Sequence, residues 1–126
     1  MRALRIVVAA QLVTQLALGV IGFAFAADAL FPGLRPLDAL ALRLAAWSNL
    51  AAAGLGAWLL TRRDPSLVRA VAVSELAYHA LAAWEGASRA WLDPVPELVE
   101  LSSGAAWFHL AWAVALAGGL AWRPRP

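Results

Sequence analysis

Long uncharged runs rich in Ala and Leu alternate along the chain with short segments that carry proline and charge. Four runs reach the roughly 20 apolar residues that a helix needs to cross the hydrocarbon core of a membrane. They cover residues 5–27, 39–61, 67–90 and 98–122. Ala and Leu favour helices, and the period-two alternation of a membrane barrel is absent. We therefore predict an all-α integral membrane protein with four transmembrane helices.

The three connections between these runs are short and rich in proline. They comprise residues 28–38, 62–66 and 91–97, with Pro36, Pro65 and Pro96 among their prolines. Short connections make consecutive helices antiparallel neighbours. The sequence therefore predicts one domain over residues 1–126, an antiparallel four-helix bundle with no soluble domain between the helices.

The composition narrows the class of protein. The chain is 63% hydrophobic and 14% charged, against about 25% charged residues in average soluble chains, which excludes an ordinary soluble enzyme. A formal net charge of +2 is too low for the basic surface of a nucleic-acid binder. The absence of cysteine excludes disulfides, thiolate nucleophiles and cysteine-ligated metals.

The arginines predict the orientation of the helices. If the helices alternate in direction, most arginines fall on one side: Arg2, Arg5, Arg62, Arg63, Arg69, Arg123 and Arg125. Arg35 and Arg89 lie near the loops of the other side. Because cytoplasmic loops carry the excess of positive charge, both termini are expected in the cytoplasm.

The N-terminal run also has the outline of a secretory signal. Arg2 and Arg5 precede an apolar stretch that ends in the A-x-A pattern of residues 24–26. The stretch is longer than the apolar region of most signals and contains Gln11 and Gln15, which a helix in a bundle can use. We expect the first helix to be retained.

Five polar side chains are predicted near the membrane midplane: Gln15, Asn49, Glu75, His79 and His109. One interpretation is an interhelical hydrogen-bond network that holds the bundle together. A hydrogen-bonding role alone does not explain Glu75, because placing an ionisable group in the membrane costs free energy. Such a residue therefore suggests a function. Glu75 and His79 are four residues apart, a spacing at which helical side chains meet, so they are the candidate catalytic acid/base pair.

Two histidines at one depth on neighbouring helices also suggest a cofactor. His79 and His109 are candidate axial ligands of a b-type haem between the third and fourth helices. No other metal site is predicted.

A second cluster is predicted in the outer half of the membrane. Arg43, Trp47, Trp84 and Trp107 approach that side from three helices. Together with the midplane residues Gln15, Asn49 and His109, they are candidate ligand-binding residues, and the tryptophans suit a flat or polyene ligand. The alternative is that the tryptophans face lipid or the core, with Arg43 extending to the interface.

With its turns and charges placed, the chain resembles the DoxX-like group of small four-helix membrane proteins. The resemblance rests on the Phe31-Pro32-Gly33 turn, on a second helix that opens with Arg43 and continues through Gly54 and Gly56, and on the turn at residues 62–65. It implies a bacterial inner-membrane protein of a group in which some members are linked to quinone-dependent redox systems or oxidative-stress complexes and many have no assigned activity. It carries no catalytic motif onto this chain. Small multidrug transporters are similar in size, but their essential carboxylate is in the first helix, where this chain has glutamines.

Three functions follow from these residues. The first is an accessory or ligand-binding subunit that contacts lipid, a quinone-like ligand or a partner membrane protein. The second is a membrane redox or lipid-modifying enzyme that uses Glu75 and His79, with or without haem on His79 and His109. The third is a small proton-coupled transporter, expected as a homodimer because four short helices enclose little volume.

Overall fold

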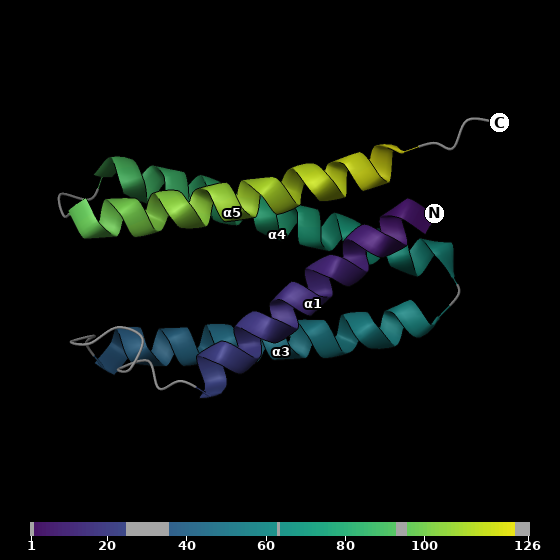
Figure 1. The fold of residues 1–126 in the computed structure, drawn as a ribbon, viewed down its shortest axis with the longest axis horizontal. Coiled ribbons are helices and arrows are strands. Elements are labelled where there is room, and N and C mark those ends of the chain that lie inside the picture. Colours follow the sequence, from purple (N-terminus) through teal and green to yellow (C-terminus); the bar gives the residue numbers. More distant parts are fainter. Residues whose placement is uncertain (1, 25–35, 63, 93–95, 123–126) are drawn as a thin grey trace. The chain divides into compact units, whose positions relative to one another are not determined.

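The computed structural model describes residues 2–24, 36–62, 64–92 and 96–122, which form four α-helices (Figure 1). They are α1 (Arg2–Ala24), α3 (Pro36–Thr61), α4 (Pro65–Leu92) and α5 (Pro96–Ala121). The predicted all-α class is confirmed for the described residues. Residues 25–27, the predicted end of the first helix, lie outside them.

Three of the helices are long and apolar enough to cross a membrane. The qualifying segments are Arg2–Ile21 in α1, Arg43–Thr61 in α3 and Ser103–Ala121 in α5. Among the described residues α4 does not qualify, because polar side chains in its middle, including Glu75 and His79, lower its mean hydropathy. The predicted crossing by α4 therefore stays a prediction.

Three helices begin at prolines that the sequence analysis assigned to the connections. Pro36, Pro65 and Pro96 are first helical residues, so the predicted starts at residues 39, 67 and 98 were two or three residues late. The first amide of a helix has no intrahelical acceptor, so the missing N–H of proline costs nothing there, and its fixed φ suits the helix. A proline in this sequence pattern marks a helix start rather than a loop.

Asp64, the residue directly before α4, is the N-terminal cap of this helix. The Asp64 Oδ1 atom accepts hydrogen bonds from the Ser66 amide nitrogen and the Ser66 hydroxyl, each at 2.8 Å. A side-chain acceptor at this position satisfies an amide that has no partner within the helix. Asp64 therefore fixes the start of α4.

One compact unit comprises Met1–Val8 and Asp64–Pro126. In it α4 and α5 run along each other as an antiparallel pair (Figure 1). The buried residues on α4 recur at spacings of four and seven and are Val68, Ala72, His79 and Gly86; Ala113 and Leu116 are buried on α5. Leu4, at the start of α1, lies beside Gly119 of α5.

The second unit, Ala9–Arg63, contains the rest of α1 and α3. Gly19 of α1 lies against Leu50 of α3, and Gly56 of α3 lies against Leu12 of α1. The later residue of one helix meets the earlier residue of the other, so the two helices are antiparallel. Gln11, Gln15 and Gly19 recur every four residues on α1 and are all buried, so they form its inward face.

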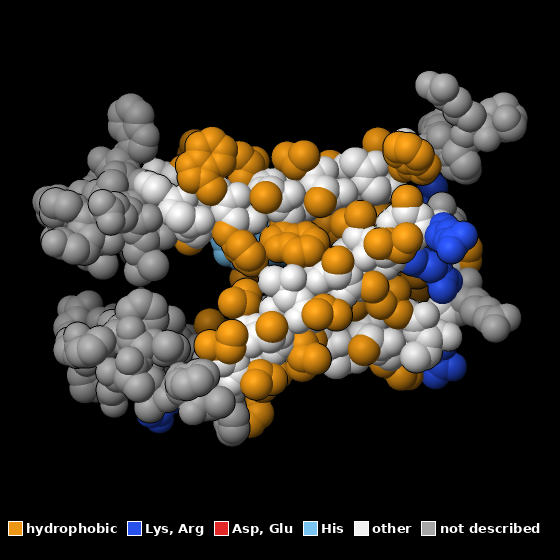
Figure 2. Space-filling view, in the orientation of Figure 1, with side chains coloured by type: hydrophobic (Ala, Val, Ile, Leu, Met, Phe, Trp, Pro, Cys, Tyr) orange, Lys and Arg blue, Asp and Glu red, His pale blue; other side chains and the backbone are white. Residues whose placement is uncertain are grey.

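Large hydrophobic side chains cover the outside of the helices. Figure 2 shows them across the visible face, with Arg side chains near the helix ends. The most exposed are Ile6, Val13, Leu55, Leu81, Trp84, Trp107, Val114 and Trp122. Soluble proteins rarely expose so much contiguous apolar surface, whereas lipid-facing helices do. The surface agrees with the apolar spans in indicating a membrane protein.

The α1–α3 contact predicts opposite effects for two glycine substitutions. A Cβ at position 19 would lie 2.7 Å from Leu50 Cγ and 3.1 Å from the Ala46 carbonyl oxygen, whereas one at position 54 would meet nothing within 4 Å. We expect Gly19→Ala to destabilise the protein by about 1–3 kcal/mol through overpacking. Gly54→Ala should stabilise it by up to about 1 kcal/mol through helix propensity. Thermal unfolding in detergent, followed by circular dichroism, measures both, and equal effects would contradict the close contact.

The cap at Asp64 predicts a pH effect. The hydrogen bond from the Ser66 hydroxyl, and then that from its amide, lower the pKa of the Asp64 carboxyl from its usual 3.8. Because the folded pKa is the lower one, the stabilisation is complete above the unfolded pKa and is lost as pH falls through the folded value. NMR titration of the carboxyl carbon measures this pKa, and a value at or above 3.8 would contradict the cap. Asp64→Asn should keep the cap and remove its pH dependence.

Candidate functional site

The most distinctive polar contact joins the two histidines. His79 of α4 and His109 of α5 are hydrogen-bonded through their Nδ1 atoms, which are 2.7 Å apart. The His79 side chain is only 3% exposed, and His109 is partly buried. A neutral imidazole carries one hydrogen on its two ring nitrogens, so one ring donates from Nδ1–H and the other accepts at Nδ1. The donor ring then has a bare Nε2, and the acceptor ring has a protonated one.

Three aromatic rings surround this pair. Tyr78 presents its ring edge-on to both histidines, with centroids 5.1 Å from His79 and 5.6 Å from His109. Phe108 meets His109 edge-on at 5.3 Å, and Trp112 lies nearly parallel to His79 at 6.3 Å. Edge-to-face and stacked arrangements are the favoured geometries of aromatic rings. These contacts orient the two imidazoles and surround them with apolar ring surface.

Glu75 lies half-buried on α4, one helical turn before His79. The regular helix keeps the four-residue spacing on which the predicted acid/base pair depends. Because the Nδ1 atom of His79 contacts His109, a carboxylate would have to reach this ring at Nε2. The pairing of Glu75 with His79 stays a prediction.

The other two predicted midplane residues belong to the second unit. Gln15 is buried on α1, and Asn49 is half-buried on α3. The Asn49 Nδ2 group donates to the Ala45 carbonyl oxygen at 3.0 Å, a bond within its own helix. The structure thus brings together His79 and His109, and the convergence of all five residues stays a prediction.

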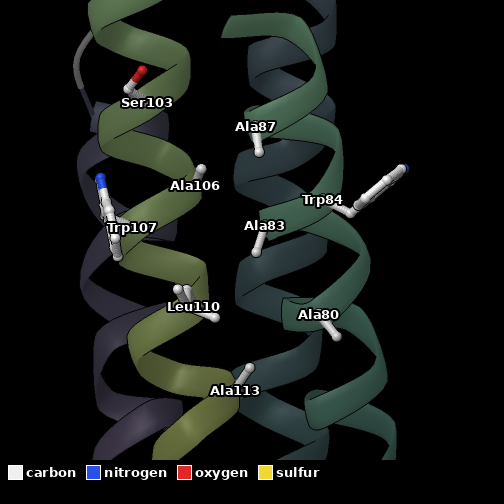
Figure 3. Close-up of a pocket in the computed structure, with 9 residues that line it drawn as sticks. All are labelled: Ala80, Ala83, Trp84, Ala87, Ser103, Ala106, Trp107, Leu110 and Ala113. Carbon is white, nitrogen blue, oxygen red and sulfur yellow. The ribbon is translucent and has the colours of Figure 1, made fainter. Parts of the chain in front are cut away.

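A groove of about 490 Å³ lies between α4 and α5 (Figure 3). Its lining is mostly alanine and consists of Ala80, Ala83, Ala87, Ala106, Ala113, Leu110, Ser103, Trp84 and Trp107. Figure 3 shows Ala83 and Ala106 between the two helices, while the Trp84 and Trp107 rings project outward on either side. The indoles are 73% and 71% exposed. The groove is therefore apolar, with an aromatic ring at each rim.

The predicted tryptophan cluster is only partly assembled by this groove. Trp84 and Trp107 line it together. Arg43 and Trp47 are exposed on α3, in the second unit. Their contribution to a shared ligand site with Trp84 and Trp107 stays a prediction.

The histidine geometry does not fit a haem between the two rings. Axial imidazoles bind iron from opposite faces of the macrocycle, so the porphyrin lies between them. Here the Nδ1 atoms are in direct hydrogen-bond contact and the ring centroids are 5.0 Å apart. This arrangement leaves no space for a porphyrin between the two rings.

The aromatic surroundings of the histidines and the alanine groove were not predicted from the sequence. Phe108 and Tyr78 each precede a histidine, and Trp112 follows His109 by three residues, a spacing that places side chains on one helix face. That spacing could have predicted that Trp112 lies near the histidines. The groove alanines recur every three or four residues, but in so Ala-rich a chain this pattern is indistinguishable from helix propensity.

The ring contact predicts the absorption spectrum of the purified protein. We expect no Soret band in the purified protein, and after addition of hemin and dithionite none of the sharp α and β bands of a bis-histidine haem, because the bonded imidazoles leave no space for one. Spectra of the protein in mild detergent, with and without added hemin, test this. A reduced b-type spectrum that is lost in His79→Ala or His109→Ala would contradict the ring arrangement.

Comparison of the chain with protein-family models, with curated proteins and with solved structures finds no match.

Proposed function

We propose that the protein is a small polytopic protein of the bacterial inner membrane that binds a lipophilic chain in the α4–α5 groove, as an accessory or ligand-binding subunit. The observation that carries the proposal is the apolar groove of about 490 Å³ with a tryptophan at each rim. Its volume falls within the roughly 300–1,000 Å³ of known small-molecule sites. The proposal includes four membrane crossings and cytoplasmic termini.

The lining favours a linear apolar ligand. Alanine side chains between the helices leave room for a chain that lies along them, and Ser103 supplies a single hydroxyl at one end of the groove. Trp84 and Trp107 offer flat apolar rings on which a planar head group can stack. These features suit a quinone-like molecule with an isoprenoid tail, in keeping with the DoxX-like resemblance. A phospholipid acyl chain is the other source of the same chemistry.

A second candidate is a membrane redox or lipid-modifying enzyme. The observation that favours it is the part-buried His79–His109 hydrogen bond, because general acid/base catalysis needs a titratable pair sheltered from water. Glu75, one turn from His79, would be the further acid/base group of this candidate. The test is turnover of a quinone or lipid by the unaltered protein and by His79→Gln. Loss of that turnover in His79→Gln, with ligand binding in the groove retained, would favour an enzyme over a binding subunit.

The groove predicts that a larger side chain on its floor blocks binding. Decylubiquinone added to the protein in detergent should quench tryptophan fluorescence saturably, because Trp84 and Trp107 adjoin the site. Ala83→Phe should raise the half-saturating concentration at least tenfold by filling the groove. Ala70→Phe, at an exposed position of α4 outside the groove, is the matched control and should bind as the unaltered protein does.

Two outcomes decide the proposal and its ligand. Equal quenching in Ala83→Phe and in the unaltered protein would overturn binding in the groove. Phospholipid with brominated acyl chains, used in place of the quinone, distinguishes the sources. If it quenches saturably and Ala83→Phe abolishes the effect while decylubiquinone does not compete, the occupant is a membrane lipid.

A further inference from the structure

We propose that Arg2, Arg5 and Arg69 bind the phosphate head group of an anionic phospholipid. They lie at the end of the first compact unit where α1 and α4 begin and α5 ends. The proposal rests on the level that these arginines share along the helices, which is the edge of the apolar spans. It does not depend on the α4–α5 groove, whose lining lies deeper in the helix pair.

The register of α4 against α5 places Arg69 at the level of Gly119. The two helices are antiparallel (Figure 1) and meet at the His79–His109 hydrogen bond. Arg69 precedes His79 by ten residues on α4. Gly119 follows His109 by the same number on α5. Because both helices rise about 1.5 Å per residue, the two positions lie at the same depth.

The first turn of α1 adds two arginines at this level. A Cβ at position 119 would lie 3.6 Å from the Cα atom of Leu4, so this turn lies against the last turn of α5. Leu4 is buried, and Arg2 and Arg5 lie on either side of it in the sequence. Their spacing of three residues puts both side chains on one face of α1. Arg2 and Arg69 are exposed, and Arg5 is half-buried.

The apolar spans end here, which places the three arginines among lipid head groups. The span of α1 begins at Arg2, and the span of α5 ends at Ala121, two residues beyond Gly119. Trp122 follows directly and is 66% exposed. Tryptophan is enriched at the head-group level of membranes. An arginine within one turn of the span edge reaches the same level by extending its side chain toward water.

The charges at this end of the unit favour an anion. Among the described residues the acid at this end is Asp64, whose carboxylate accepts two hydrogen bonds from Ser66. Guanidinium groups bind phosphate oxygens through paired N–H donors. A choline head group would bring its own positive charge beside the arginines. A lipid with a net negative charge, such as phosphatidylglycerol, is therefore preferred.

Native mass spectrometry of the full protein in detergent tests the site with two added lipids, dioleoylphosphatidylglycerol and dioleoylphosphatidylcholine. They share their acyl chains and differ in head-group charge. We expect the phosphatidylglycerol to bind at least about tenfold more tightly. Arg2→Gln and Arg69→Gln should each raise its Kd about fivefold, the contribution of one arginine near a membrane surface. The Kd of the phosphatidylcholine should not change, which shows that each variant is folded.

Arg62→Gln is the matched control, because it also removes one exposed positive charge. The Arg62 guanidinium belongs to the second unit and lies 4.8 Å from the centroid of the Trp58 ring. Its loss should leave phosphatidylglycerol binding unchanged. Equal affinity for the two lipids, or unchanged binding in Arg2→Gln and Arg69→Gln, would overturn the proposal. A loss in Arg62→Gln as large as in those two variants would also overturn it, since it would indicate attraction to positive charge in general.

Discussion

A polar side chain in an apolar helix needs a partner within the protein, because lipid supplies none. Two arrangements among the described residues meet this constraint. Five hydroxyls and amides bond a carbonyl of the preceding turn in their own helix: Thr14, Ser48, Asn49, Thr61 and Ser88. His79 instead bonds His109 across the α4–α5 contact. The histidine bond joins two helices, which these five bonds within single helices do not.

The two helix pairs are held together by different contacts. In α1 and α3, Gly19 and Gly56 each leave space that a leucine of the opposite helix fills. Dispersion contacts of this kind need close approach, which small residues allow. In α4 and α5 the contact contains imidazoles and aromatic rings, whose favoured orientations fix the rotation of one helix against the other. The α1–α3 contact depends on side-chain volume, and the α4–α5 contact depends also on hydrogen-bond geometry.

The sequence predicted the helices well and the site in part. Length and hydropathy determine a helix that must satisfy its own backbone bonds, so the four helices were predictable, and the errors at Pro36, Pro65 and Pro96 arose from treating proline as a loop residue. Counting residues from the helix ends also predicted that His79 and His109 lie at the same depth in the membrane. Depth does not predict rotation about the helix axis, however, and a step of one residue turns a side chain by about 100°. Asn49 illustrates this limit, since its amide bonds its own helix.

The groove and the histidine pair are neighbours on the α4–α5 pair. Ala83 follows His79 by four residues on α4, and Ala106 precedes His109 by three on α5, spacings that place side chains on one helix face. The two features are therefore separated along the helices by about one turn and not by rotation around them. A ligand in the groove meets alanine and tryptophan, while the imidazoles lie among Tyr78 and Trp112.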